Sequence, residues 1–522
     1  MPKIKEIRAM QILDSRGKPT IKTTVITESG IIGVASVPSG ASTGIYEALE
    51  LRDHEKKEGE DDKKEKERRK KERYDGYGVL KAVRNVNDVI SPELIKKGYD
   101  VTNQAEIDKF MIDLDEKLYK LNPLRSTTGK SNKSCLGANA ILSVSLACAR
   151  AAAKYQNKSL YIYIAEQYES IYNKEDFEKL ENSGHKGYNF EPRVLPCPMS
   201  NVINGGSHAD NNVDMQEYMV APYGAKSFND AIHMVFKTFQ RLKELLKRDG
   251  LSTGVGDEGG FAPNLQSNEE PLIYILEAIK NTEYEPGKDI FITMDPASSE
   301  FYDQKDHRIR KRYSLSDYDE YLTSEKMIKH YIELREKYPE IISIEDGLAQ
   351  DDWAGWISMT EKMGDRSKKI GEKIQIVGDD LFVTNKERLQ QGIEKKAANA
   401  ILIKLNQIGT LTETLETIAL ARENRYNIVI SHRSGETCDT FIADLAVGVN
   451  AGQIKTGSIC RSERIAKYNR LLEIEAELGN KALFGNRDYL AFNQINELET
   501  KYNPCLPAGI FIMDCIWVLN SY

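Results

Sequence analysis

The amino-acid sequence predicts an α/β protein whose parallel strands and helical crossovers close into a β/α barrel. Between about residues 195 and 485, short runs of β-branched residues alternate with longer amphipathic segments. The runs end on charged or titratable side chains, which are Asp295, Glu345, Asp379, Lys404, His432 and Lys455. The successive gaps of 50, 34, 25, 28 and 23 residues are each long enough for one strand and one helix. Because reactive side chains in such a barrel gather at the carboxyl ends of the strands, we expect these six to meet at its mouth.

The composition favours a soluble, globular protein of about two domains. The chain has 522 residues, of which 40% are hydrophobic, and a formal net charge of −8. This mild acidity gives no general electrostatic footprint for nucleic acid, so we expect no nucleic-acid partner. The seven cysteines show neither metal-type pairing nor disulfide spacing, which suits a reducing compartment. The N-terminal segment lacks the apolar core of a signal peptide, and no apolar run is long enough to span a bilayer, so we expect a cytoplasmic location.

Three of the six strand ends are carboxylates, and their convergence predicts a metal site. A single strand-terminal acid is more often a helix cap or a loop contact, but six polar ends in register are hard to explain as independent caps. Asp295, Glu345 and Asp379 would repel one another in one buried mouth, so a hard cation such as Mg²⁺ is their natural partner. Lysines beside that cation would stay charged or lose a proton easily, and a lysine with a depressed pKa is a good general base. Lys404 and Lys455 are the candidates.

Sequence motifs over about residues 5 to 485 occur in the order found in one known family. They include D-S-R-G, V-P-S-G-A-S-T-G, N-G-G-S-H-A, V-G-D-E-G-G-F-A-P-N, S-I-E-D, K-L-N-Q-I-G-T, S-H-R-S-G-E-T and Q-I-K-T-G. With these motifs the chain resembles the enolase family of glycolytic lyases. The resemblance implies a modified β/α (TIM-like) barrel, a smaller N-terminal α+β domain and a homodimer. We therefore expect four segments, which are an N-terminal domain over residues 1–165, an inserted linker over 166–194, the barrel over 195–485 and an extension over 486–522.

The reaction that the resemblance implies is the reversible dehydration of 2-phospho-D-glycerate to phosphoenolpyruvate by a phosphopyruvate hydratase. Removal of the proton from carbon 2 creates a highly charged enediolate, and two Mg²⁺ ions stabilise it, as is known for the enolase superfamily. By motif matching, Asp295, Glu345 and Asp379 resemble the ligands of the first ion. Ser42, in the S-G-A-S-T-G motif, resembles a ligand of the second.

The same matching implies acid, base and binding roles. Lys404 resembles the base that removes the proton. Glu258, helped by Glu217, resembles the acid that protonates the departing hydroxyl. Lys455 resembles the group that steadies the substrate carboxylate. The other implied site residues bind the phosphate or line the same pocket, and they are Arg433, Ser434, His208, Gln216 and His432.

Two other functions stay open at this point. A structural or binding protein that kept the enolase shell but lost turnover would show substitutions at the metal acids, the base or the acid, and the sequence shows none. A racemase or cycloisomerase of the same superfamily would place its bases differently and would not need the acid of G-D-E-G-G. Each motif taken alone could be a turn or a flexible loop, so the assignment depends on their joint occurrence.

Several segments depart from the family pattern. Residues 52–73 are almost wholly charged with both signs mixed, which is typical of a solvated helix or a disordered arm, and their basic end is a candidate contact for an acidic surface. Segments near 119–131 and 167–193 are predicted to be surface loops. The apolar stretch of the extension is interrupted by Asp514 and is too short to span a membrane. Single replacements of residues usual in the family, none at a position assigned to chemistry, are Lys18, Tyr77 and Cys438.

Two pairs of positions that belong to the family's dimer interface have changed together. A glutamate and an arginine that commonly meet there correspond to Lys22 and Glu473, so the signs are exchanged. A second arginine and glutamate correspond to Met10 and Ala476, so both charges are absent. Drift on a solvated surface would explain one exchange, whereas coordinated changes favour an interface that still exists. We therefore predict a homodimer in which Lys22 meets Glu473 of the partner subunit.

Overall fold

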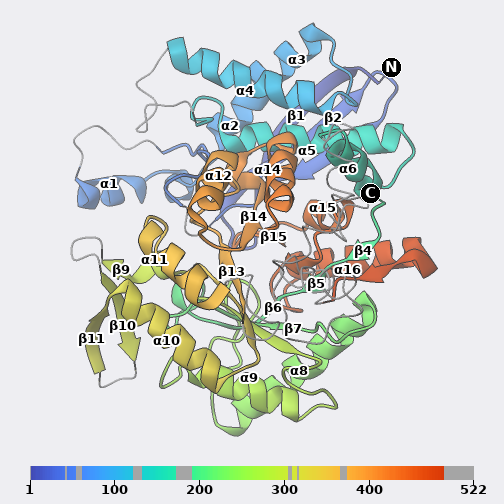
Figure 1. The fold of residues 1–522 in the computed structure, drawn as a ribbon. Helices are drawn as coiled ribbons and strands as arrows, with labels where there is room; N and C mark the ends of the chain where they lie inside the picture. Colours follow the sequence, from blue (N-terminus) through green and yellow to red (C-terminus); the bar gives the residue numbers. More distant parts are fainter. Residues whose placement is uncertain are drawn as a thin grey trace, which may run out of the picture.

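A computed structural model describes residues 2–40, 44–54, 61–121, 132–171, 191–303, 308–313, 317–364 and 373–486. Ser42, most of the predicted loops 119–131 and 167–193, and the extension from residue 487 lie outside these ranges. The described chain forms an N-terminal unit, at the top of Figure 1, and a barrel below it. None of the helices described is both long and apolar enough to cross a membrane.

The N-terminal unit is an antiparallel sheet of three strands packed on helices (Figure 1). The strands are β1 (Ile4–Leu13), β2 (Pro19–Thr27) and β3 (Ile32–Ser36), and the helices are α2 (Leu80–Arg84), α3 (Ser91–Lys97), α4 (Gln104–Leu121), α5 (Ala138–Tyr155) and α6 (Leu160–Glu169). A π-helical turn, η2 (Asn85–Ile90), joins α2 to α3. The sheet buries one face, since Ile21, Thr23 and Val25 of β2 are buried and the residues between them are partly exposed. That face packs on α5, and a Cβ at Gly33 would lie 2.1 Å from the Ala147 carbonyl oxygen, so only glycine fits there.

The charged insertion is a short helix on the side of this unit. Helix α1 (Asp62–Arg69) begins after Asp61, whose side chain accepts a hydrogen bond from the Lys63 amide at 2.9 Å, and is followed by the 3₁₀ turn η1 (Arg73–Gly76). Most of its described side chains are exposed. Of the two predicted forms, the described part of the insertion therefore takes that of a solvated helix.

Nine strands form the barrel sheet, in the order β5-β16-β15-β14-β13-β12-β8-β7-β6. In chain order they are β5 (Cys197–Pro198), β6 (Ser200–Asn204), β7 (Glu217–Ala221), β8 (Phe291–Asp295), β12 (Ile341–Glu345), β13 (Gln375–Gly378), β14 (Ala400–Ile403), β15 (Asn427–Ser431) and β16 (Gln453–Lys455). The two edge strands, β5 and β6, are consecutive in the chain and are separated by Met199 alone. One continuous segment therefore pairs with both ends of the sheet and closes it. The predicted α/β class, with a TIM-like barrel and a smaller N-terminal domain, is confirmed.

The start of the barrel departs from the parallel arrangement that the strand spacing predicted. Strands β8 and β12 to β16 are parallel to one another, but β6 pairs antiparallel with β7, and β7 pairs antiparallel with β8. The segment between β6 and β7 contains only the 3₁₀ turn η4 (Gly206–His208) and no helical crossover. Parallel neighbours need a long crossover, usually a helix, so this connection gives an antiparallel pair instead.

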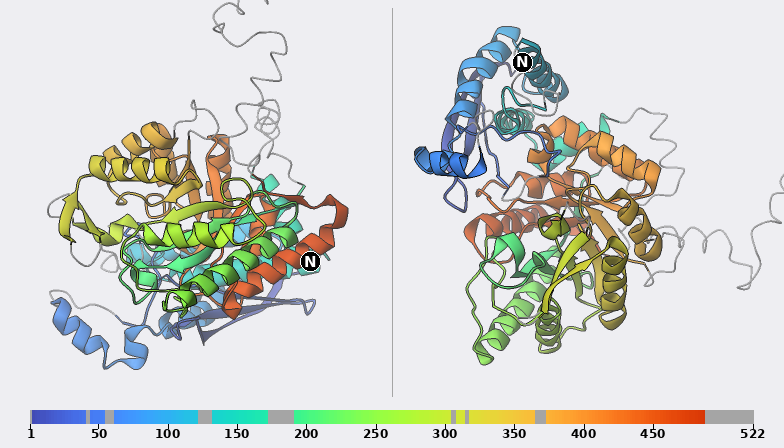
Figure 2. Two further views of the ribbon diagram at one scale, coloured as in Figure 1. Left: turned by 90° about the horizontal axis from the view of Figure 1, so that it is seen from below. Right: turned by 90° about the vertical axis from the view of Figure 1, so that its left-hand side faces the viewer.

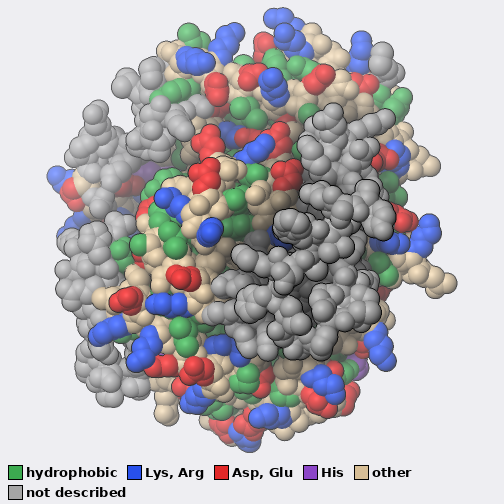
Figure 3. Space-filling view, viewed as in Figure 1, with side chains coloured by type: hydrophobic (Ala, Val, Ile, Leu, Met, Phe, Trp, Pro, Cys, Tyr) green, Lys and Arg blue, Asp and Glu red, His purple; other side chains and the backbone are tan. Residues whose placement is uncertain are grey.

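Helices cover the outside of the barrel (Figure 2). They are α8 (Phe228–Arg248), α9 (Glu270–Lys280), α10 (Ser324–Lys337), α11 (Trp353–Met359), α12 (Lys386–Lys395), α13 (Leu405–Ile408), α14 (Leu411–Glu423), α15 (Phe441–Gly448) and α16 (Ser462–Leu478). Short helical turns are η5 (Ser298–Phe301), η6 (Thr360–Gly364) and η7 (Gly479–Lys481). The smaller sheets are β9 (Tyr302–Asp303), β10 (Arg308–Tyr313) and β11 (Asp317–Leu322), and β4 (Val194–Leu195) with β17 (Leu483–Phe484). Figure 3 shows acidic and basic side chains interspersed over one face, so neither sign dominates it.

The N-terminal unit sits against the barrel end at which the parallel strands finish. Ser39 and Gly435, which follows β15, form a β-bridge with amide-to-carbonyl bonds of 2.8 and 2.9 Å. Arg150 of α5 contacts the Asp439 carboxylate at 2.5 and 2.8 Å. The N-terminal unit therefore covers the barrel mouth and can contribute residues to any site there.

Candidate functional site

The structure brings the six predicted strand ends together. Asp295, Glu345 and Lys455 are the last residues of β8, β12 and β16, while Asp379, Lys404 and His432 follow β13, β14 and β15 directly. Five of these six line one pocket, together with the predicted residues His208, Gln216, Glu217, Glu258, Arg433 and Ser434. Glu345 joins them through its contact with Lys455. Of the predicted site residues, only Ser42 lies outside the described ranges.

Lys455 is the centre of one half of the pocket. Its Nζ lies 2.7 Å from Asp295 Oδ2, 2.8 Å from Glu345 Oε1 and 3.1 Å from Glu217 Oε1. Burial alone would lower the pKa of this lysine, but Asp295, Glu217 and Glu345 outweigh burial and raise it well above its ordinary value. One ammonium thus faces three buried carboxylates. Burial, and then the charge of Asp295, raises the pKa of Glu345.

Lys404 and Asp379 form a second centre. Lys404 Nζ lies 2.5 Å from Asp379 Oδ2, and the Gln407 side-chain amide donates to Asp379 Oδ1 at 2.8 Å. Burial opposes the charged form of both groups, yet their mutual attraction lowers the pKa of Asp379 and raises that of Lys404. In this arrangement Lys404 is therefore a charged ammonium held against an acid.

Asp346, directly after Glu345, shapes the strand ends instead of facing the pocket lysines. The backbone amides of Asp379 and Asp380 donate to its two carboxylate oxygens, at 2.9 Å each. Its φ of 42° lies in the left-handed region, which turns the chain sharply after β12. Burial and the neighbouring Asp379 raise the pKa of Asp380 to about 7. The two consecutive acids therefore have different contacts. Glu345 contacts Lys455, whereas Asp346 binds the backbone of the loop that follows β13.

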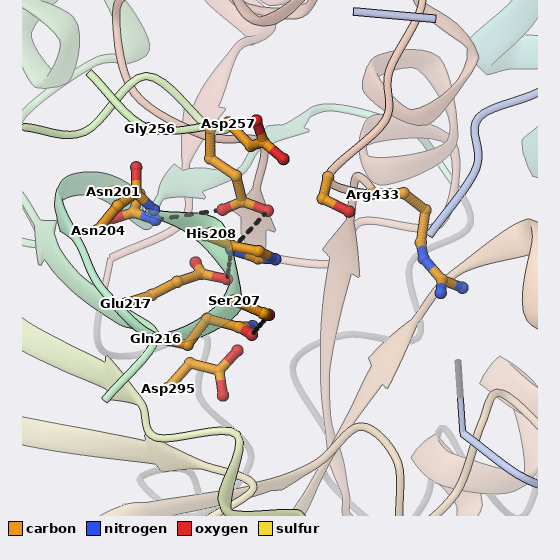
Figure 4. Close-up of polar contacts among 12 residues, drawn as sticks. Asn201, Asn204, Ser207, His208, Gln216, Glu217, Gly256, Asp257, Asp295 and Arg433 are labelled. Atoms are coloured by element: carbon orange, nitrogen blue, oxygen red, sulfur yellow. Dashed lines mark hydrogen bonds and ion pairs between the residues drawn. The ribbon is translucent and has the colours of Figure 1, made fainter. Parts of the chain in front are cut away.

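Two carboxyl groups, Glu217 and Glu258, lie beside His208 and His432 in the same pocket. Figure 4 shows Glu217 and His208 next to each other. His208 Nδ1 lies 3.6 Å from Glu217 Oε1 and 3.5 Å from Glu258 Oε1, and His432 Nε2 lies 3.2 Å from Glu258 Oε1. Burial, and then the charge of Glu258, raises the pKa of Glu217 well above its usual range. Burial acts on Glu258 in the same direction, but His432 and His208 outweigh it and lower the pKa of Glu258. The two environments push the pKa values of the pair apart, that of Glu217 upward and that of Glu258 downward.

His432 is fixed in one tautomer. Arg464 Nη1 lies 2.7 Å from His432 Nδ1, and because arginine can only donate, Nδ1 is the acceptor. The ring proton is then at Nε2, which faces Glu258. Burial, together with the Arg464 charge, lowers the pKa of His432 to about 3 although Glu258 acts in the opposite direction.

Arg433 and Ser434 lie at the boundary between the two units. Arg433 Nη1 and Nη2 donate to Glu47 Oε2 and Oε1 at 2.9 and 3.1 Å. Figure 4 shows the Arg433 side chain directed away from His208 and Glu217. Ser434 Oγ accepts from Arg16 Nη1 at 3.3 Å.

Sequence reasoning missed several residues that hold the predicted ones in place. Arg16 belongs to the D-S-R-G motif, so the sequence marked its position but did not show which residues it contacts. Gln407 likewise belongs to the motif K-L-N-Q-I-G-T, which did not show that it contacts Asp379. Glu47 and Arg464 gave no signal of their own, because each acts through a partner distant in the chain. Contacts of this kind depend on the fold and not on local spacing.

The acids of the pocket fit a hard cation. Carboxylate oxygens are the ligands that Mg²⁺ prefers, and Glu345 Oε2 and Glu217 Oε2 are buried with no hydrogen-bond partner among the residues described. Asp346, Asp379 and Asp380 form one group whose ligand atoms all lie within 4.8 Å of one another, and His208, Glu217 and Glu258 form another. The predicted set of Asp295, Glu345 and Asp379 is instead divided between the two lysine ammonium groups. These acids are paired with lysine here. Asp379 also accepts from Gln407, and Asp295 Oδ1 accepts from the Ala297 amide, so within this set Glu345 Oε2 is the oxygen without a hydrogen-bond partner among the residues described.

Two family models match the chain. Residues 4–164 match the enolase N-terminal domain, and residues 192–492 match the enolase C-terminal TIM barrel domain. Together these matches span most of the sequence and agree with the two units of the fold. The chain therefore belongs to the enolase family and is a lyase of the enolase superfamily.

Proposed function

We propose that this protein is a phosphopyruvate hydratase, which interconverts 2-phospho-D-glycerate and phosphoenolpyruvate. The observation that carries the proposal is one buried pocket that holds two arrangements of titratable groups. Lys404 contacts Asp379, and in the carboxyl pair the pKa of Glu217 is raised while that of Glu258 is lowered. Dehydration needs such a base and such an acid, since a proton leaves carbon 2 and a hydroxyl leaves carbon 3. A silent binding protein would have no use for this pair of centres.

Lys404 is the proposed base. Its Nζ would take the proton from carbon 2, and Asp379 holds that nitrogen in position at 2.5 Å. Lys455, at the centre of the other acids, would hold the substrate carboxylate as negative charge builds up on it. Two Mg²⁺ ions, with Asp295, Glu345 and Asp379 as ligands of the first and Ser42 of the second, would supply further positive charge and favour the neutral form of Lys404.

Glu258 and Glu217 are the proposed acid for the second step. Glu217, whose pKa is raised, would hold the proton of the pair, and His208 lies 3.6 Å from Glu217 and 3.5 Å from Glu258. The pair would deliver this proton to the hydroxyl that leaves carbon 3. Arg433 and Ser434 would bind the phosphate, and Gln216, whose side-chain oxygen accepts from Ser207 at 2.8 Å, would line the same pocket.

Formation of phosphoenolpyruvate tests this proposal directly. Purified protein should produce its absorbance from 2-phosphoglycerate when Mg²⁺ is present, and removal of the metal with a chelator should abolish the signal reversibly. Lys404→Ala serves as the control for contaminating activity. Folded protein that gives no product with Mg²⁺ present would contradict the proposed function.

A further inference from the structure

The phosphate-binding edge of Arg433 is already occupied by a carboxylate of the same chain. Glu47 accepts from both Nη1 and Nη2, at 2.9 and 3.1 Å, which is the paired geometry that arginine offers to phosphate. Both side chains are buried, with exposed fractions of 4% for Arg433 and 7% for Glu47. Burial would lower the pKa of Arg433, but Glu47 outweighs it and raises the pKa. The pair is thus a desolvated ion pair and not a loose surface contact.

Glu47 keeps other donors if Arg433 leaves it. The Gly44 amide donates to Glu47 Oε1 at 3.1 Å, and the Gln407 side-chain amide lies 3.4 Å from the same oxygen. Gln407 also donates to Asp379 Oδ1 at 2.8 Å. Exchange of Arg433 from Glu47 to another anion would therefore not strand a bare buried carboxylate, which is the usual obstacle to breaking a buried pair.

We propose that Glu47 is a positioning residue that occupies Arg433 as a built-in substitute for phosphate and so sets the affinity of the site for phosphorylated ligands. A ligand must displace this carboxylate, so weak anions are excluded and a dianionic phosphate is selected. The inference rests on the phosphate role proposed for Arg433. It adds to that role that phosphate must compete with the Glu47 carboxylate for Arg433.

The direction of the effect distinguishes competition from simple support. If Glu47 only held Arg433 in place, its loss would weaken phosphate binding. If Glu47 competes, loss of its charge removes both the competing anion and a like charge beside the phosphate, and binding becomes tighter. Glu50 offers a matched control, because it lies on the same segment but pairs with Arg52 at 2.7 Å and accepts from Ser39 Oγ at 3.1 Å.

The test is the dissociation constant of inorganic phosphate, measured by calorimetry on the full chain. Glu47→Gln should bind phosphate roughly tenfold more tightly than the wild type, and Glu50→Gln should change the constant by less than about twofold. Glu47→Asp, which keeps the charge, should stay nearer to the wild type than Glu47→Gln does. With substrate, Glu47→Gln should lower KM more than it changes kcat.

The outcomes separate this inference from the proposed function. Because phosphate binding needs no turnover, tighter binding by Glu47→Gln would support the inference even in a protein without lyase activity. Weaker or unchanged binding would contradict it, even if the lyase assay succeeds. Glu47→Ala is a second variant in case Glu47→Gln does not fold, and loss of the fold in both would show that Glu47 is a structural anchor, which also contradicts the inference.

Discussion

At the scale of single residues, the pocket separates a proton acceptor from a proton donor. Lys404 is paired with Asp379, whereas Glu258 is held by two histidines and shares its surroundings with Glu217. The two centres contact different partners, so a substitution in one should leave the other intact. Their separate effects on the two proton transfers can therefore be measured.

Replacement of the base and of the acid should have different consequences. Lys404→Ala should slow the exchange of the carbon 2 proton with solvent by about 10²-fold or more, because no other group is proposed to accept it. Glu258→Gln should keep that exchange and lose dehydration, since the acid is needed after the proton has left. Exchange is measured by isotope incorporation into 2-phosphoglycerate and dehydration by absorbance. Exchange at the native rate in Lys404→Ala would mean that the base is another residue.

His432 makes the stability of the protein dependent on pH. Its pKa of about 3 in the folded state lies below the ordinary value of about 6.5, so between these values the unfolded chain binds a proton and the folded chain does not. The contribution of His432 is full above pH 6.5 and is lost as pH falls towards 3. Between pH 7 and pH 5 the wild type should lose about 2 kcal/mol more unfolding free energy than His432→Asn, measured by urea denaturation. Equal losses in the two proteins would contradict this assignment.

The six strand-end residues could be predicted to meet because each ends or directly follows its own strand, whereas the other site residues came from the resemblance to the family. The runs that end at Asp295, Glu345 and Lys455 supply a local signal, and the closed barrel turns sequence order into spatial proximity. Which lysine meets which acid could not be predicted, since that depends on side-chain directions across the barrel. Glu47 reaches Arg433 from 386 residues away, and no local pattern encodes such a contact.

At the scale of elements, the insertion is attached to the N-terminal unit by two of the residues that depart from the family pattern. The Tyr77 ring has Lys18 Nζ 4.4 Å from its centroid and Arg69 Cζ, from α1, 4.0 Å away. His54 adds a second attachment, because its ring nitrogens lie 2.9 Å from Glu72 and 3.3 Å from Glu65. Lys18 and Tyr77 looked unrelated in the sequence, and the structure shows that they form one contact.

Removal of the Tyr77 ring should release α1 without affecting the reaction. Three cations contact this ring, since Arg52 Cζ lies 5.9 Å from its centroid as well, and the Arg69 contact that holds α1 is worth about 0.5–1 kcal/mol at a partly exposed site. Tyr77→Ala should therefore raise the rate of trypsin cleavage between residues 61 and 73 severalfold. Tyr74→Ala is the matched control, since that ring is 41% exposed and lies beside Arg73 alone in the contacts described. Turnover should be unchanged in both. Equal cleavage of the two variants would show that Tyr77 does not hold the helix.

The start of the barrel shows where prediction of elements failed. The alternating runs that end in charged residues were found correctly for β8 and for β12 to β16, and these strands are parallel. Strands β6 and β7 carry no such ending and were not recognised as strands from the sequence, although their connection without a helix forces an antiparallel pair. This reversal is what places Glu217 opposite Asp295 in the pairing of β7 with β8.

At the scale of the whole molecule, two surfaces carry the residues predicted to meet in a dimer. Met10 and Lys22 are direct neighbours across β1 and β2, and Met10 is 57% exposed. Glu473 and Ala476 are exposed three positions apart on α16, so they lie on one face of that helix. The two substituted pairs are therefore adjacent on each surface, as one interface requires. The domain limits at 165, 194 and 485 stay predictions, and α6 continues past the first of them to Glu169.

The ion pair that Glu473 makes within its own chain is exposed. Its side chain is 66% exposed and lies 3.2 Å from Arg470 Nη1. Arg470 also contacts Glu477 through Nη1 and Asp444 through Nη2. An exposed ion pair of this kind stabilises a protein by about 1 kcal/mol or less, so Glu473 can exchange it for a cation on another subunit. We propose that Lys22 provides this cation and that the protein is a homodimer. A conventional enolase subunit would be rejected, because it would place arginine opposite Lys22 and glutamate opposite Glu473.

The predicted contact can be tested by variants that reverse the charges of Lys22 and Glu473. Lys22→Glu and Glu473→Arg should each weaken the dimer roughly tenfold or more, because each leaves like charges facing one another in a partly desolvated contact. The double variant restores an attractive pair in the opposite sense and should recover much of the loss, which a double-mutant cycle on the dimer dissociation constant measures. Analytical ultracentrifugation over nanomolar to micromolar concentrations gives these constants. Additive weakening in the double variant, or a wild-type protein that is monomeric at micromolar concentration, would contradict the predicted contact, whereas recovery would show that Lys22 and Glu473 meet across the interface in place of the family's original pair.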